Sequence, residues 1–255
     1  FDIPHLAWGG DLSADVKGRN RIFSNRALAF YIGTSVFFSL PLLPIFETSE
    51  FTPETLAWSV MIAAPVTLLA IFFCVFNVPD NRSIPQKFGR GVDASGGNKS
   101  FFKLAKNKPF TIFLVAFIFT GIGGGMWFGL IFIYVDSYLG LGNELSLSYL
   151  LGFLFSILTV FIWKWIAEKF DKNISWCAGM LLVMLGIVGT GFLSPGESGW
   201  WSLLVCMLLV NGGMASSVAL APSLLSDIID YGSWKSGQKS SALYFSVYTF
   251  ALKAN

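Results

Sequence analysis

The sequence predicts an all-α polytopic membrane protein, and three observations support this fold class. Of its 255 residues, 54% are hydrophobic and only 13% are charged, whereas a soluble domain contains about 25% charged residues. Nine Trp and 26 Phe fit a protein surrounded by lipid. Uncharged runs long enough to cross a bilayer, about 20 residues each, recur along the chain, with short polar connectors between them.

Six of these runs are complete and two are partial. The complete runs are 27–46, 55–79, 109–135, 145–163, 173–196 and 198–226. Residues 3–10 read as the last turns of an earlier helix, and 240–252 as the first half of a later one. The chain begins on Phe1 without an initiator Met and ends inside an apolar run. We therefore expect a piece of a longer protein, with helices missing at both ends.

The connectors alternate in charge along the chain. Sixteen of the seventeen Lys and Arg residues lie in four of them or at the adjoining helix ends, at 11–26, 80–108, 164–172 and 227–239. Three other connectors contain no Lys or Arg, namely 47–54, 136–144 and 195–197. Because Lys and Arg accumulate in cytoplasmic loops, we expect the first set to be cytoplasmic and the second to be external.

The connector 80–108 differs from the others in its length and its content of Gly, Ser and basic residues, which are typical of a flexible linker. It divides the chain into the remainder of an N-terminal helix bundle (1–79) and a C-terminal bundle (109–255). Two bundles joined by a cytoplasmic loop are the layout of transporters built from repeated halves. On that layout, 1–79 holds the end of helix 4 with helices 5 and 6, and 109–255 holds helices 7 to 10 and the first half of helix 11.

Two ionisable residues lie deep in apolar sequence. Lys253 follows Ser240 by 13 residues, or about 20 Å along a helix. Asp2 precedes the charged connector at Asp11 by nine residues, or about 13 Å. A charge inside a membrane costs on the order of 3 kcal/mol on insertion scales and marks a functional site by default. The alternatives are a lysine that snorkels to the surface and an interfacial aspartate.

Two motifs give the chain a family resemblance. The first comprises Asp2-Ile3-Pro4, Asp11-Leu12-Ser13, Arg19-Asn20-Arg21-Ile22 and Arg26. The second comprises Ser226-Asp227-Ile228-Ile229-Asp230-Tyr231-Gly232, Lys235, Tyr248-Thr249 and Lys253. In order and spacing they resemble the fourth and fifth helices, and the tenth and eleventh helices, of the melibiose permease family. These glycoside–pentoside–hexuronide:cation symporters belong to the major facilitator superfamily.

The resemblance implies a sugar site at the middle of the membrane. Asp2 matches an aspartate that binds sugar hydroxyls beside the cation site, and carboxylates accept such bonds well. Trp8 lies near, though not in perfect register with, a tryptophan that stacks on the sugar. Arg26 matches an arginine of the sugar site, although connector charge alone places it at the helix end. Thr249 and Lys253 match positions near the sugar and the coupling cation, so Asp2 and Lys253 are the candidate coupling residues.

The same resemblance implies a cytoplasmic gate formed by Arg19, Asp227 and Asp230. In the family, similar residues form ion pairs that close the cytoplasmic side, and Arg21 lies beside Arg19 in the sequence. The alternative is a solvated helix end, because exposed ion pairs contribute only about 0–1 kcal/mol each. Weak pairs nonetheless suit a contact that opens in every transport cycle.

The sequence indicates no cofactor and no resident metal. Cys74, Cys177 and Cys206 lie inside apolar runs without the spacing of metal ligands, and no catalytic motif is present, so we expect no enzyme. His5, the single histidine, follows Asp2 by one helical turn. It could bond Asp2, contact a substrate or take part in proton coupling, although a lone histidine is more often a packing residue.

We therefore expect an inner-membrane symporter that takes up a glycoside or related sugar, driven by Na⁺ or H⁺. Its partners would be the small-molecule sugar and the lipid bilayer, and no nucleic acid, since the net charge is only +2. A lysolipid or other amphiphile carrier of the same family is the first alternative. A membrane-embedded enzyme or a non-transporting sensor is the alternative from another class.

Overall fold

The computed structural model describes residues 6, 7, 9, 10, 12, 13, 15–46, 52–77, 104, 106–195, 199–236 and 241–254. These residues form helices, and no strand occurs among them. The elements, in chain order, are α2 (Val16–Ser39), the 3₁₀ turn η1 (Leu40–Leu42), α3 (Pro53–Asn77), α5 (Lys108–Ile133), the π-helical turn η4 (Tyr134–Leu139), α6 (Gly142–Lys169), α7 (Lys172–Thr190), α8 (Gly199–Ser236) and α9 (Ser241–Ala254).

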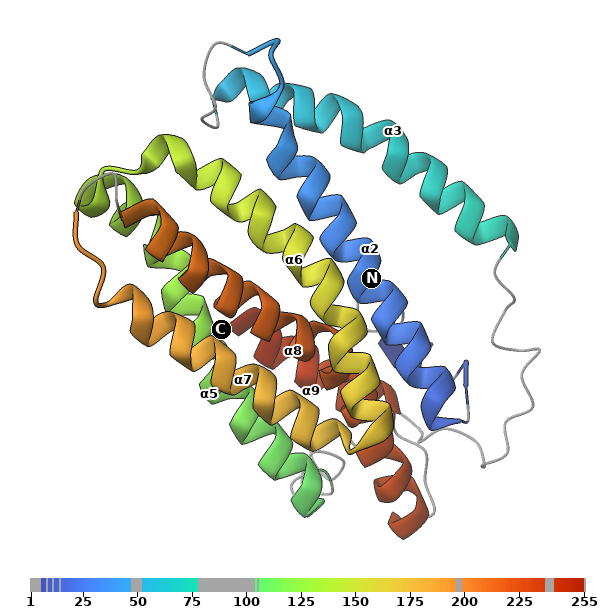
Figure 1. The fold of residues 1–255 in the computed structure, drawn as a ribbon. Helices are drawn as coiled ribbons and strands as arrows, with labels where there is room; N and C mark the ends of the chain where they lie inside the picture. Colours follow the sequence, from blue (N-terminus) through green and yellow to red (C-terminus); the bar gives the residue numbers. More distant parts are fainter. Residues whose placement is uncertain are drawn as a thin grey trace.

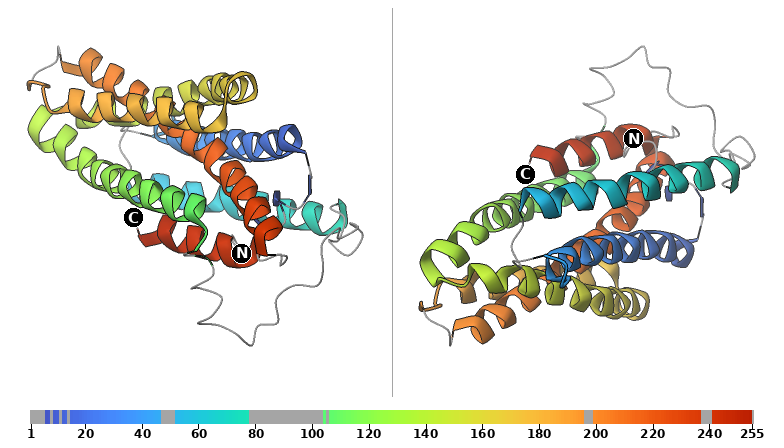
Figure 2. Two further views of the ribbon diagram at one scale, coloured as in Figure 1. Left: turned by 90° about the horizontal axis from the view of Figure 1, so that it is seen from below. Right: turned by 90° about the horizontal axis from the view of Figure 1, so that it is seen from above.

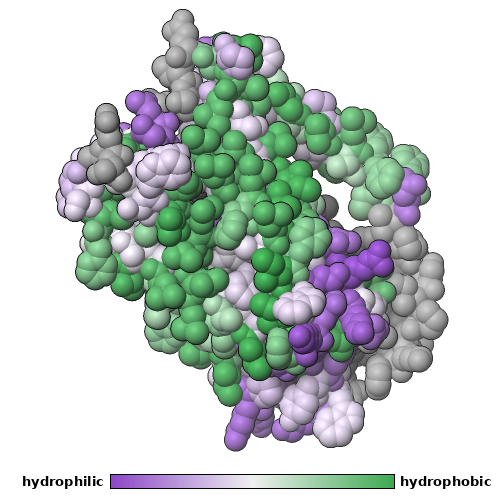
Figure 3. Space-filling model, viewed as in Figure 1, coloured by the Kyte–Doolittle hydropathy of each residue, from purple (hydrophilic) through white to green (hydrophobic). Residues whose placement is uncertain are grey.

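The predicted all-α membrane fold is confirmed. Five stretches of described helix are long and apolar enough to cross a membrane: α3, α5 with η4, α6, α7 and α8. They correspond to five of the six complete runs in the sequence. Bulky apolar side chains such as Phe72, Phe119 and Leu158 are more than half exposed. Hydrophobic residues accordingly cover most of the face seen in Figure 3, while hydrophilic residues gather toward one end.

The bounds of the sixth run, 27–46, differ from those of α2 at both ends. The helix begins eleven residues earlier, at Val16, after Asp15 accepts a hydrogen bond from the Gly18 N–H and so caps it. It ends at Ser39, and Pro41 lies in the 3₁₀ turn that follows. The charged turns around Arg19 and Arg21 are therefore helical. α8 likewise continues past the end of its apolar run, through Asp227 and Asp230 to Ser236.

Successive long helices run in opposite directions (Figures 1 and 2). The starts of α2, α5, α7 and α9 consequently lie with the ends of α6 and α8. We call this the charged end, because the described basic connectors lie there. Its assignment to the cytoplasm remains a prediction.

α2, which precedes the connector 80–108, packs against α6 and α8, which follow it. Ala27 and Tyr31 of α2 lie in one buried cluster with Val160 and Trp163 of α6 and with residues of α8. Farther along, the ring of Phe38 stacks on Tyr149 with centroids 4.9 Å apart. We call this contact between α2 and the later helices the seam. α3 packs less closely, and only Thr55 and Ser59 are buried in it.

Glycines allow α7 and α8 to lie in close contact. A Cβ atom on Gly179 of α7 would lie 2.9 Å from the Gly213 carbonyl oxygen, and one on Gly213 would lie 2.4 Å from the Gly179 oxygen. α8 remains helical through Gly213 and through Pro222. Of the two roles that internal glycines commonly have, packing and bending, packing is the one evident at these positions.

Candidate functional site

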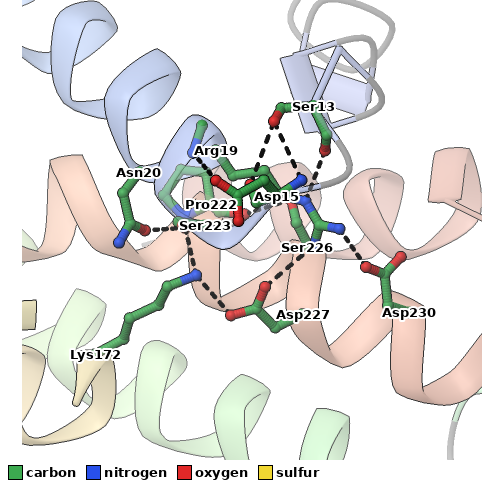
Figure 4. A network of polar contacts seen from close by, with 11 residues as sticks. Ser13, Asp15, Arg19, Asn20, Lys172, Pro222, Ser223, Ser226, Asp227 and Asp230 are labelled. Carbon is green, nitrogen blue, oxygen red and sulfur yellow. Dashed lines mark hydrogen bonds and ion pairs between the residues drawn. The ribbon is translucent and has the colours of Figure 1, made fainter. Parts of the chain in front are cut away.

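The strongest polar cluster lies at the charged end of the seam, where Arg19 of α2 faces α8 (Figure 4). The turn before α2 positions Arg19: its Nε donates to the Ser13 carbonyl at 3.0 Å. The Ser13 hydroxyl in turn accepts from the Asp15 N–H at 3.2 Å. A Cβ on Gly18 would lie 2.1 Å from the Ser13 hydroxyl, so this turn requires a glycine. The Arg19 side chain is consequently held against α8 and is 7% exposed.

Both carboxylates of the sequence motif bind Arg19. Its Nη1 donates to Asp227 at 3.1 Å, and its Nη2 forms an ion pair with Asp230. The two aspartates are three residues apart on α8, so they lie on one face of the helix. The predicted grouping of Arg19, Asp227 and Asp230 is therefore present in the structure. Arg21, two residues after Arg19, lies on the exposed side of α2.

A second cation shares Asp227. Lys172, the first residue of α7, places its Nζ 2.6 Å from an Asp227 oxygen and 2.8 Å from the Ser223 hydroxyl. Lys172 is buried, at 6% exposure. The Ser223 hydroxyl donates to the side-chain oxygen of Asn20, next to Arg19, at 2.6 Å. Two cations and two carboxylates therefore balance in charge, and the paired groups offset the cost of burying them.

In the sequence, Lys172 lies in a basic connector, and no motif indicates a role for Asn20 or Ser223. Ser223 and Asp227 are four residues apart, so the spacing alone places both on one face of α8. That spacing was a signal for Ser223. No comparable sequence signal brings Lys172 to the same face, because its contact depends on how α7 packs against α8.

The sequence-predicted sugar site is only partly described. Asp2, Trp8 and His5 lie outside the described residues. Arg26 lies ten residues inside α2, or about 15 Å from its start, rather than at the helix end that connector charge indicated. Arg26 is half-buried, and Phe23 of the same helix lies in one buried cluster with residues of α9. α2 and α9 therefore contribute to a shared region inside the bundle.

The two α9 residues of that predicted site differ in their surroundings. Thr249 is 3% exposed, and its hydroxyl has no hydrogen-bond partner in the part of the chain that the structure describes. A buried polar group without a partner is costly, so this hydroxyl is a candidate ligand contact. Lys253 lies in the last turn of α9 and is exposed. It lies twelve residues after Ser241, about 18 Å along the helix.

A separate contact anchors the end of α8. The Asn107 side-chain amide donates to the Tyr244 hydroxyl at 3.0 Å and to the Ile228 carbonyl at 3.4 Å. Gly232 lies against both side chains. Through this contact the starts of α5 and α9 hold the helix turn that presents Asp227.

Fold and geometry together define a polytopic helical membrane protein with a polar, charge-balanced cluster at the charged end of the seam. The sequence pattern of the MFS/sugar transport protein family matches residues 1–255. The chain therefore belongs to this family of the major facilitator superfamily, and the resemblance found in the motifs is confirmed at that level.

Two curated relatives are similar to the chain. The "Putative 2,3-dihydroxypropane-1-sulfonate exporter" of Escherichia coli (strain K12) is 27% identical over 192 residues, covering 74% of this chain and 40% of the relative. The "Isoprimeverose transporter" of Lactiplantibacillus pentosus is 25% identical over 272 residues, covering 99% of this chain and 52% of the relative. The chain thus spans about half or less of the length of these relatives.

Proposed function

We propose that the protein to which this chain belongs is a secondary active transporter of the inner membrane. It would take up a glycoside or related sugar together with Na⁺ or H⁺ by alternating access. The observation that carries the proposal is the ion-pair cluster of Arg19, Asp227 and Asp230, which joins a helix before the connector 80–108 to one after it. A contact between the two groups of helices at one end is what alternating access must make and break.

The proposed sugar site comprises Asp2, Trp8, Arg26, Thr249 and Lys253, with Asp2 and Lys253 coupling the cation. The depth of Arg26 inside α2 and the unpaired Thr249 hydroxyl support this site. The isoprimeverose transporter among the relatives supports a sugar as the substrate class. No enzymatic reaction is proposed, because the family is one of transport proteins.

The proposed gate comprises Arg19, Asp227 and Asp230 at the charged end. Closure at this end is supported by the residues before α2, since Leu6 is buried in one cluster with Phe23 and Phe245. In this conformation a substrate would reach the site from the opposite, external side. Opening would separate Arg19 from both carboxylates and expose all three groups to water.

A second candidate is export of a small anionic polyol. The relative described as a dihydroxypropane-sulfonate exporter favours it, and so does the cationic character of Arg26 and Lys253, which would bind a sulfonate. The same gate would serve either direction of transport.

The test is uptake by the full-length protein in proteoliposomes. A panel of labelled glycosides, pentosides and hexuronates, with 2,3-dihydroxypropane-1-sulfonate added, is offered with and without a Na⁺ or pH gradient. We expect one sugar to accumulate only with a gradient. Asp2→Asn and Lys253→Ala should abolish that accumulation, while Lys169→Ala, at an exposed lysine that ends α6, should leave it unchanged.

Three results would contradict parts of this proposal. Transport of the sulfonate alone would establish the second candidate. Transport that is indifferent to both site substitutions would refute the proposed site. If no panel member is transported, the sugars and the sulfonate are excluded as substrates and lipid-like substrates are favoured.

A further inference from the structure

Polar contacts cross the charged end of the seam at two depths. The outer level contains the ion pairs of Arg19 with Asp227 and Asp230. The inner level, one turn deeper along α8, is the uncharged hydrogen bond between Ser223 and Asn20. Asn20 is 1% exposed and Ser223 is 0% exposed. Burial makes this short bond less accessible to water than the ion pair of Asp230, which is 58% exposed.

Lys172 links the two levels from within the later group of helices. Its ammonium donates both to Asp227 and to Ser223 (Figure 4). An ammonium group can only donate, so the Ser223 oxygen must accept from it. The single hydroxyl hydrogen of Ser223 is then directed to the Asn20 oxygen, which is an acceptor. Lys172 thereby fixes the direction of the bond that crosses the seam.

We propose that Asn20 and Ser223 form a second, uncharged latch, and that Lys172 is the counterion that stays with Asp227 when Arg19 leaves. This inference rests on the gate in the proposed function and extends it to three further residues. Lys172 and Ser223 belong to α7 and α8, which pack closely along their lengths. When the seam opens, Lys172 and Asp227 therefore remain together, and only Arg19 and Asn20 exchange their partners for water.

The two parts of the proposal predict effects of opposite sign. Loss of the Asn20–Ser223 bond weakens only the closed conformation, so opening becomes easier. Loss of the Lys172 charge acts differently, because Lys172 and Arg19 bind the two oxygens of the same Asp227 carboxylate and their like charges repel each other. Without Lys172, Arg19 is the remaining cation on Asp227, and its departure leaves that carboxylate without a counterion. Opening then becomes harder.

A single reporter cysteine measures opening in the full-length protein. Ser24 is 2% exposed and lies one turn beyond Asn20 on α2. Ser24→Cys is placed in a background in which Cys74, Cys177, Cys206 and every cysteine outside this chain are replaced by serine. The rate at which a membrane-impermeant maleimide alkylates this cysteine from the charged-end side reports how often the seam opens.

We expect Asn20→Ala and Ser223→Ala each to raise the alkylation rate about two- to tenfold, the range for one hydrogen bond. The double variant should exceed the single variants little, since each substitution removes the same bond across the seam. Lys172→Gln, which keeps a donor without the charge, should lower the rate, and Lys172→Arg should leave it near the parent value. Asn25→Ala and Lys169→Met, at exposed positions of the same residue types, are the matched controls.

Arg19→Gln separates failure of the latch from failure of the gate. If Arg19→Gln raises the rate while Asn20→Ala and Ser223→Ala do not, the second latch is refuted and the gate stands. If Arg19→Gln has no effect, the gate itself is refuted. A rise with Lys172→Gln would overturn the role of Lys172 as a retained counterion, since a merely structural lysine would loosen the seam. Melting temperatures identify any variant that fails to fold.

Discussion

At the residue scale, Gly232 of the Asp227–Gly232 motif has a structural reason to be glycine. A Cβ atom there would lie 2.5 Å from the Tyr244 hydroxyl and 2.8 Å from the Asn107 amide nitrogen. Both distances are shorter than any normal contact with a carbon atom. The bond between Asn107 and Tyr244, which joins the starts of α5 and α9 beside α8, therefore depends on the missing side chain.

We predict that Gly232→Ala destabilises the protein by about 1–3 kcal/mol, the usual cost of overpacking. The measurement is the thermal unfolding midpoint of purified protein in detergent. Tyr244→Phe removes the hydroxyl that the new methyl group meets, so adding it to Gly232→Ala should cost less than the sum of the two single effects. Gly129→Ala, where a Cβ atom would meet nothing within 4 Å, is the control. Equal effects of Gly232→Ala and Gly129→Ala would contradict the prediction.

The polar cluster illustrates what residue patterns could and could not predict. The family resemblance of the motifs implied the grouping of Arg19, Asp227 and Asp230, and these three side chains are in contact in the structure. Lys172 was missed because its burial depends on the packing of α7 against α8, and no local pattern encodes that packing. Asn20 and Ser223 were missed because uncharged polar residues in helices usually bond their own backbone, as Ser226 does with Pro222.

At the element scale, apolar runs predicted five helices of membrane-spanning length but not the residues at which the helices begin and end. The apolar run 27–46 marks where α2 can contact lipid, but the helix begins at Val16, where Asp15 caps it. Capping and hydrogen bonding determine helix ends, whereas hydrophobicity determines only the depth of insertion. This difference in the start of α2 matters for the proposed sugar site. Arg26 lies about 15 Å from the start of α2 rather than at the helix end.

The packing of α7 on α8 gives a second prediction at this scale. A Cβ atom on Gly179 would lie 1.9 Å from the Ser216 hydroxyl oxygen and 2.5 Å from the Ser216 Cβ atom. It would also lie close to the Gly213 backbone. Backbone cannot move aside as a flexible side chain can, so the two helices would have to separate.

We predict that Gly179→Ala lowers the thermal unfolding midpoint more than Gly232→Ala does. Gly123→Ala of α5, which would meet nothing within 4 Å, is the matched control for a glycine inside a membrane helix. An unchanged midpoint for Gly179→Ala would show that the close contact is not required for stability.

At the scale of the whole molecule, connector charge and helix direction agree. The described long helices alternate in direction, and the basic connectors that are described all lie at one end (Figure 1). The ion-pair cluster lies at that same end. The positive-inside rule predicts that this end is cytoplasmic. The proposed gate would then lie on the cytoplasmic side, and the substrate path would be open to the exterior.

Cysteine labelling in intact cells tests this orientation. In the cysteine-free full-length protein, Glu144→Cys at the start of α6 should react with a membrane-impermeant maleimide added outside the cell. Lys169→Cys at the end of the same helix should react only after the cells are permeabilised. The two positions lie 25 residues apart on one helix, or about 37 Å, so each serves as the control for the other. The reverse pattern would place the charged end outside and make the proposed gate external. Labelling of both positions in intact cells would mean that α6 does not cross the membrane.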